Sequence, residues 1–427
     1  MTRMTSTLIH GAGTAFFLRV TGAGLGFALN LLLARALGTA GVGLYFLALT
    51  LLSIFVLIGR LGLDGIVLRE VAAAHSVGDG QRVRTVVKDA QTIAVCASLA
   101  VMAAVFVSAP WLAASVFQKP ELGTLLQQAM FAILPVSLIV LLGEGLKGVG
   151  RIRDSQLSQA VFTPAINLVV LLAVPAITLG VAMWSFVAAA AVAAAAAYWF
   201  WLRMCPTATG TGKDAHPALL LAALPFMGIQ FLNAVTDWAD ILLLGALGDA
   251  AEVGIYGMAK RITQITGFVL IAVAAVASPQ FAALHRNTEQ AQLARLALKA
   301  ARLAMLVASP ILVVCLVFPD WVMGWFGAGF RAGATVLLLL TIGQLVNIGF
   351  GFTGMLLTMT GHEVIMQRIL MSVTALNLIL NFVLIPYLGM LGAAIAFSVT
   401  TIVQNLMAWI HVRQRLGFRC DVLALVR

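Results

Sequence analysis

Seven ionisable side chains interrupt apolar segments that are long enough to cross a membrane. The cations are Arg19, Arg35, Arg60, Lys260 and Arg261, and the acids are Asp237 and Asp240. An ionisable group inside a span costs roughly 2.5–3.5 kcal/mol on insertion scales, and such groups usually mark a transport pathway. A guanidinium group can bind two phosphate oxygens at once through its planar set of donors. The excess of cations therefore predicts a binding site for an anionic cargo.

Two of these cations also have an explanation that involves no cargo. Arg35 and Arg60 lie close enough to span ends for their heads to reach the interface by snorkelling. Arg19 is harder to explain in this way, and we expect it to face a cavity. Anchoring and cargo binding both stay open for Arg35 and Arg60.

The two acids can compensate part of the positive charge. Asp237 and Asp240 are spaced i, i+3 and so share one helix face. The rise of 1.5 Å per residue places Asp240 and Lys260 at a similar depth, about 10 Å from the outer interface. We therefore predict an ion pair between Asp240 and Lys260 or Arg261. Such a pair either holds two helices together or opens as a gate when cargo arrives.

The composition excludes a soluble protein. Hydrophobic residues form 62% of the 427 residues and charged residues only 10%, against about 25% charged residues in soluble domains. Many apolar runs approach the ~20 residues that a membrane-spanning helix needs, and the alternation typical of a transmembrane β-barrel is missing from the sequence. We predict an all-α polytopic membrane protein with about twelve spans, near residues 15–37, 44–63, 92–116, 122–142, 157–179, 181–202, 218–246, 254–277, 303–323, 333–357, 369–387 and 390–412.

The net charge of +10 follows a membrane topology, which argues against a nucleic-acid partner. If the N-terminus is cytoplasmic, the connections on the outer side carry only Lys119 and Arg331, whereas most Lys and Arg lie inside. This asymmetry predicts that both ends are cytoplasmic. The outer connections are short, so we expect no enzyme site on that side. The four cysteines lack metal or redox spacing, and we expect no cofactor.

The chain repeats itself at an offset of 210–211 residues. Asn30–Gly38 aligns with Asp240–Gly248, and Tyr45 aligns with Tyr256. Further matches are Arg84 with Arg295, Lys88 with Lys299, Gly150 with Gly361, Asn167 with Asn377, and Pro175 with Pro386. An even number of helices per half makes the halves parallel repeats. We predict two pseudo-symmetric six-helix lobes around a central cavity, with an N-terminal lobe 1–203, a cytoplasmic linker 204–217 and a C-terminal lobe 218–427.

Several segments resemble the Wzx-type polysaccharide flippases of the multidrug/oligosaccharidyl-lipid/polysaccharide (MOP) exporter superfamily. These segments are Asn30–Leu49, Gly62–Glu70, Ala239–Gly245 and Glu252–Arg261. The resemblance implies a multi-pass protein of a bacterial inner membrane that flips an undecaprenyl-pyrophosphate-linked oligosaccharide outward by alternating access. It also implies a cationic cavity with basic residues on the first, second and eighth helices, which here are Arg19, Arg60, Lys260 and Arg261.

The resemblance also names the partners and leaves two rival functions. The partners it implies are the lipid-linked glycan, of the kind used for lipopolysaccharide O-antigen, and membrane lipids, with polysaccharide assembly proteins as further candidates. A cation-coupled multidrug exporter of the same superfamily is the first rival, although such a carrier would favour acidic groups in its lobes. A membrane glycan polymerase or ligase is the second, and it would need a larger outer loop. We therefore expect a transporter and no enzyme.

Overall fold

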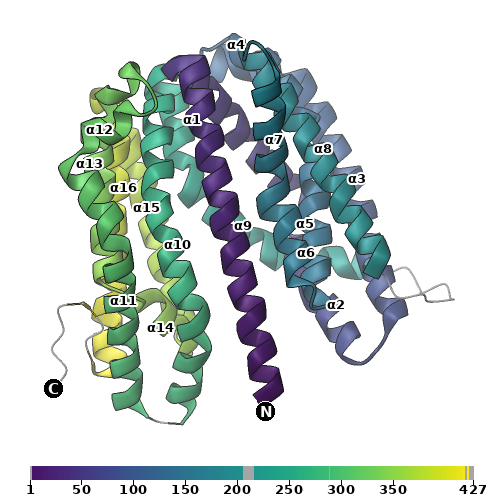
Figure 1. The fold of residues 1–427 in the computed structure, drawn as a ribbon, viewed down its shortest axis with the longest axis vertical. Coiled ribbons are helices and arrows are strands. Elements are labelled where there is room, and N and C mark those ends of the chain that lie inside the picture. Colours follow the sequence, from purple (N-terminus) through teal and green to yellow (C-terminus); the bar gives the residue numbers. More distant parts are fainter. Residues whose placement is uncertain (1, 205–215, 288, 419–420, 423–427) are drawn as a thin grey trace. The chain divides into compact units, whose positions relative to one another are not determined.

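The structure, a computed structural model, describes residues 2–204, 216–287, 289–418 and 421–422. All regular structure in these ranges is helical, as predicted (Figure 1). The helices up to the predicted linker are α1 (Thr2–Arg60), α2 (Leu63–Ser76), α3 (Gly80–Trp111), α4 (Glu121–Met130), α5 (Ile133–Gly148), α6 (Ile152–Gln156), α7 (Phe162–Ala173) and α8 (Leu179–Met204). Those that follow are α9 (His216–Leu247), α10 (Ala250–Arg286), α11 (Gln290–Val317), α12 (Pro319–Gly324), α13 (Ala334–Gly349), α14 (Thr353–Met359), α15 (Glu363–Leu388) and α16 (Met390–Leu416).

The polytopic membrane fold is confirmed. Among the described residues, nine helices are long and apolar enough to cross a membrane, and ten if α4 and α5, bent by 43°, form one span. The count of ten is below the predicted twelve for two reasons. The first two predicted spans, 15–37 and 44–63, lie mainly in the single helix α1, and α9, which contains predicted span 218–246, is not among the nine.

Helix α1 is interrupted at Gly38, which has φ 67° and ψ −174°. A positive φ of this size is readily adopted only by glycine, so Gly38 divides α1 into two helical arms. The repeat aligns Gly38 with Gly248, which lies between α9 and α10. The chain thus breaks its helix at equivalent positions in both halves.

Two tight turns at aligned positions of the repeat have the same backbone geometry. Gly150 joins α5 to α6, and Gly361 joins α14 to α15; both have φ 79°. These glycines are aligned at the 211-residue offset, and each ends a helix in the left-handed conformation. The sequence repeat therefore corresponds to a repeated backbone geometry.

The chain divides into two compact units, Met1–Trp238 and Ala239–Arg427. The division lies within α9. Most of the predicted linker, residues 205–215, lies outside the described residues, so the lobe boundaries and the cavity between the lobes stay predictions.

Each unit has its own apolar core. In the first unit the core joins α2, α3, α5, α8 and the start of α9, with Val67, Val87 and Leu142 fully or almost fully buried. In the second unit it joins α10, α11 and α13–α16 around residues such as Phe281 and Ile348. Large apolar side chains also cover outer faces of the helices, as lipid contact requires.

Candidate functional site

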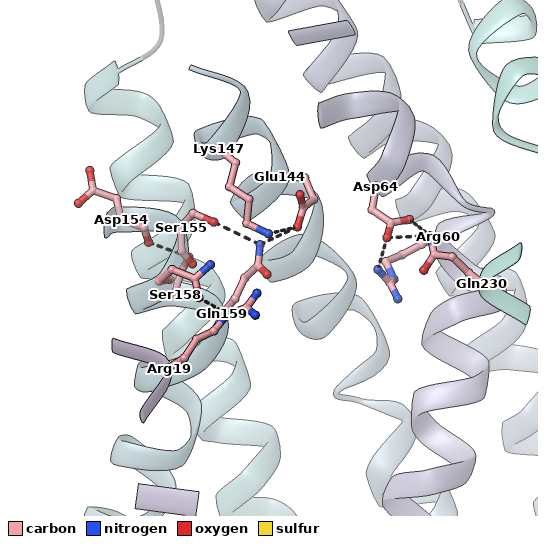
Figure 2. A network of polar contacts seen from close by, with 11 residues as sticks. Arg19, Arg60, Asp64, Glu144, Lys147, Asp154, Ser155, Ser158, Gln159 and Gln230 are labelled. Carbon is pink, nitrogen blue, oxygen red and sulfur yellow. Dashed lines mark hydrogen bonds and ion pairs between the residues drawn. The ribbon is translucent and has the colours of Figure 1, made fainter. Parts of the chain in front are cut away.

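The first polar cluster lies where α1 gives way to α2. Arg60 Nη1 donates to Asp64 Oδ2 at 3.1 Å, and Gln230 Nε2 on α9 donates to both carboxylate oxygens at 2.9 Å (Figure 2). The Arg60 Nε is buried, and within the described part of the chain it has no hydrogen-bond partner. An unsatisfied buried donor is costly, so this guanidinium retains capacity for an acceptor.

A glycine allows α9 to approach this cluster. Gly62 has φ 74°, and a Cβ at this position would lie 2.6 Å from the backbone nitrogen of Met227. Any side chain would therefore both strain the turn and push α9 away. The close packing brings Gln230 within reach of Asp64.

The second polar contact fixes Arg19. Its Nε donates to Gln156 Oε1 at 3.0 Å, and Gln156 is only 5% exposed. Figure 2 shows Arg19 near the α6 segment. The Arg19 side chain itself is exposed, and its two Nη groups have no hydrogen-bond partner among the residues that the structure describes. Gln156 thus orients the Arg19 guanidinium and leaves its two Nη groups without a hydrogen bond to a described residue.

Gln156 ends α6 at a π-helical turn, Leu157–Val161. Turns of this kind interrupt regular helix geometry and recur at functional sites. Helix α1 packs closely against this turn, because a Cβ on Gly22 would lie 2.3 Å from the carbonyl oxygen of Ala160. The close contact explains how α1 brings Arg19 to Gln156.

A third network joins α5 to the same turn. Glu144 Oε1 accepts from Lys147 Nζ at 2.5 Å and from Gln159 Nε2 at 3.2 Å, and Gln159 also contacts Ser155 Oγ at 3.4 Å (Figure 2). The sequence analysis assigned Lys147 to the cytoplasmic connection after span 122–142 and did not consider Glu144. Their i, i+3 spacing was the available signal.

The second unit contains a buried triad on α9 and α10. Asp240 Oδ2 accepts from Lys260 Nζ at 2.6 Å and from the Tyr256 hydroxyl, while Oδ1 accepts from the backbone N–H of Ile241 at 2.8 Å. Asp240, Tyr256 and Lys260 are 1%, 0% and 4% exposed. Of the two candidate partners of Asp240, Lys260 forms the ion pair, and Tyr256 is a third member that the sequence analysis did not place there.

The remaining predicted residues lie outside these clusters. Arg35 and Asp237 have exposed side chains, and Arg261 is partly buried. Asp64, the partner of Arg60, is a third acid that the count of five cations against two acids did not include, so the positive excess among these groups is two charges instead of three. Over the described ranges, no three His, Cys, Asp or Glu side chains gather as metal ligands would.

Comparison with known proteins identifies the family. The family described as "Polysaccharide biosynthesis protein" matches residues 8–285, more than half of the chain. The chain belongs to this family. A curated relative, the "Probable low-salt glycan biosynthesis flippase Agl15" of Haloferax volcanii, is 30% identical over 172 residues. That match covers 40% of this family member and 36% of the relative, so the chain spans about a third of the relative's length.

Solved structures give the fold of this family member. An inward-facing multidrug resistance MATE family transporter of the MOP superfamily matches with a TM-score of 0.75 and 16% identity, over 95% of this chain and 98% of that one. The lipid II flippase MurJ in an inward closed conformation matches with a TM-score of 0.76 and 14% identity, over 95% and 87%. Both matches show that the chain has the helical fold of these transporters.

Proposed function

We propose that this chain is a flippase that moves an undecaprenyl-pyrophosphate-linked oligosaccharide from the cytoplasmic to the outer leaflet of a bacterial inner membrane. The observation that carries the proposal is the orientation of Arg19. Gln156 holds the Arg19 Nε and leaves two Nη groups for a ligand. This arrangement suits two oxygens of a phosphate group. Family membership and the flippase named among its relatives support the same interpretation.

Arg60 is the second cargo-binding group in this proposal. Its guanidinium contacts Asp64 through Nη1 and keeps an unsatisfied Nε. An incoming pyrophosphate would satisfy that donor and compete with the Asp64 carboxylate for the cation. Arg35, Lys260 and Arg261 complete the proposed set of substrate-binding cations.

The buried Asp240–Lys260 pair serves as a gate in this proposal, together with Asp237. Cargo can shift an equilibrium between inward-open and outward-open states only by binding the two states differently. Exchange of the Asp240 carboxylate for cargo phosphate at Lys260 would supply such a difference. The lipid tail stays in the bilayer throughout.

The membrane potential is sufficient to drive the proposed transfer. An inside-negative potential favours outward movement of an anion by about 2.3 kcal/mol per charge per 100 mV. A pyrophosphate diester with two charges would therefore gain about 4–5 kcal/mol per 100 mV. Coupling to Na⁺ or H⁺ is then not needed. Collapse of the potential in proteoliposomes should slow flipping, and an unchanged rate would contradict the energetic argument.

The topology and partners follow from the same proposal. Both termini lie in the cytoplasm, where the glycan is built, and the chain acts as a carrier with no reaction of its own. Polysaccharide assembly proteins on the outer side would receive the flipped glycan.

A cellular experiment tests the proposal. In a strain that depends on this chain for surface glycan, Arg19→Gln should reduce glycan export at least about tenfold, as expected from the loss of charge-assisted hydrogen bonds. Arg19→Lys should retain part of the export, because the charge remains without the planar donors. Arg69→Gln, a change at an exposed cation outside the site, is the matched control. Normal export in Arg19→Gln, with normal protein levels in the membrane, would contradict the proposal.

The rival function is a cation-coupled multidrug exporter. The fold shared with a MATE transporter and the buried carboxylate of Asp240 favour it. Deletion of the gene distinguishes the two functions. Loss of drug resistance with intact surface glycan would support the exporter, and loss of glycan with unchanged resistance would support the flippase.

A further inference from the structure

A small polar pocket lies between α15 and α16 in the second unit, remote in sequence from the proposed cargo site. Its volume is about 240 Å³, which is below the ~300–1,000 Å³ of drug-sized sites. Its polar lining is made by Arg368 and Ser372 on α15 and by His411 and Arg415 on α16. Each pair is spaced i, i+4, so each helix presents both of its polar groups on one face.

Within the described residues, no carboxylate forms an ion pair with the arginines of this pocket, Arg368 and Arg415. His411 Nδ1 lies 2.8 Å from the carbonyl oxygen of Met407, so that nitrogen carries the proton of the hydrogen bond and Nε2 remains available. Two guanidinium groups and a hydroxyl within one small pocket match the oxygens of a single phosphate group.

Helix α15, which lines the pocket, also carries exposed apolar side chains. Ile369 and Met407 contribute apolar walls. Along α15, exposed Val364, Met371 and Ile379 lie on the helix face that carries Arg368. A ligand whose phosphate enters the pocket would therefore have an apolar surface beside it for hydrocarbon chains.

We propose that this pocket binds the phosphate headgroup of an anionic phospholipid in the cytoplasmic leaflet. The positive-inside assignment places Arg368 and Arg415 at the cytoplasmic ends of their helices, where anionic lipids concentrate and attract basic clusters. The apolar face of α15 favours a lipid over a soluble phosphate. The proposal concerns a site separate from the cargo cations and does not depend on the flippase function.

Native mass spectrometry of the purified full-length protein in detergent tests the proposal. Dioleoyl phosphatidylglycerol is titrated in, with dioleoyl phosphatidylcholine as the zwitterionic comparison. The double variant Arg368→Gln/Arg415→Gln should weaken phosphatidylglycerol binding at least about tenfold, because it removes both charged donors. Phosphatidylcholine binding should change little. Arg368→Lys/Arg415→Lys retains the charge, and its affinity for phosphatidylglycerol should lie between those of the wild type and the Gln double variant.

The control separates a specific site from general attraction. Arg69→Gln/Arg153→Gln removes the same number of exposed charges elsewhere, and it should leave phosphatidylglycerol binding unchanged. Equal losses in both double variants would overturn the proposal. Displacement of phosphatidylglycerol by millimolar inorganic phosphate would assign the pocket to soluble phosphate. Stronger retention of a polyprenyl phosphate would assign it to the carrier lipid. Either result would overturn the phospholipid assignment.

Discussion

Removal of one member of the Asp240–Lys260 pair should destabilise the protein by an amount that depends on which member is removed. Asp240→Asn takes from the Lys260 ammonium, 4% exposed, the carboxylate that it contacts at 2.6 Å. Lys260→Met leaves the Asp240 carboxylate with the Tyr256 hydroxyl and the Ile241 N–H as donors. The anion therefore keeps two hydrogen bonds when the cation is lost, whereas the cation loses its anion when Asp240 is changed.

These contacts set the expected magnitudes. Removal of one partner of a buried ion pair costs about 3–5 kcal/mol, and we expect this cost for Asp240→Asn because Lys260 loses its carboxylate and keeps its charge. Loss of one charge-assisted hydrogen bond costs about 1.5–3 kcal/mol, which we expect for Lys260→Met. The double variant contains no buried charge at these positions and should cost about 0–2 kcal/mol. It should thus be more stable than Asp240→Asn alone.

The assay is equilibrium unfolding in mixed detergent micelles, followed by tryptophan fluorescence for the wild type, both single variants and the double variant. The double-mutant cycle should give a coupling energy of at least about 2 kcal/mol. If the two single effects add within about 0.5 kcal/mol, the residues are energetically independent. That result would refute both the stabilising role of the Asp240–Lys260 pair and its proposed role as a gate.

Two further predictions concern other parts of the first unit and the repeat. Asp64→Asn should tighten the binding of free pyrophosphate, measured by isothermal titration calorimetry, because Arg60 loses its internal anion. Arg60→Gln should weaken this binding. The opposite order of affinities would contradict the role of Arg60 as a cargo-binding group. Gly150→Ala and Gly361→Ala should each cost about 1–2 kcal/mol of unfolding free energy, because both glycines have φ 79°. Neither cost should include a steric clash, since the space where a Cβ would lie is open at both positions. Clearly unequal costs would argue against equivalent turns.

The fold class was accessible from the sequence because it depends on properties that accumulate over many residues. Long apolar runs determine helices that span lipid, whatever their detailed packing. The repeat rested on rarer residue types, and the shared φ of Gly150 and Gly361 gives it a geometric basis. The break at Gly38 falls in the predicted connection between spans 15–37 and 44–63, but the structure interrupts the helix at a single residue instead of a loop of several residues.

The candidate site was predicted only in part. The Asp240–Lys260 pair followed from depth along two consecutive helices, which the helical rise determines. Asp64 was missed because the second span was expected to end at residue 63, although its i, i+4 spacing from Arg60 was a usable signal. Gln156 and Gln230 are uncharged and distant in sequence from their partners, so only tertiary packing reveals their contacts.

Flipping in a purified system is the decisive test of the proposed function. The full-length protein is reconstituted into liposomes that contain a fluorescent undecaprenyl-pyrophosphate oligosaccharide, and the arrival of glycan in the opposite leaflet is followed by quenching. We predict flipping well above protein-free liposomes, and a rate for Arg19→Gln close to the protein-free level. Wild-type protein that flips no faster than protein-free liposomes, or an Arg19→Gln variant as fast as wild type, would contradict the proposed function.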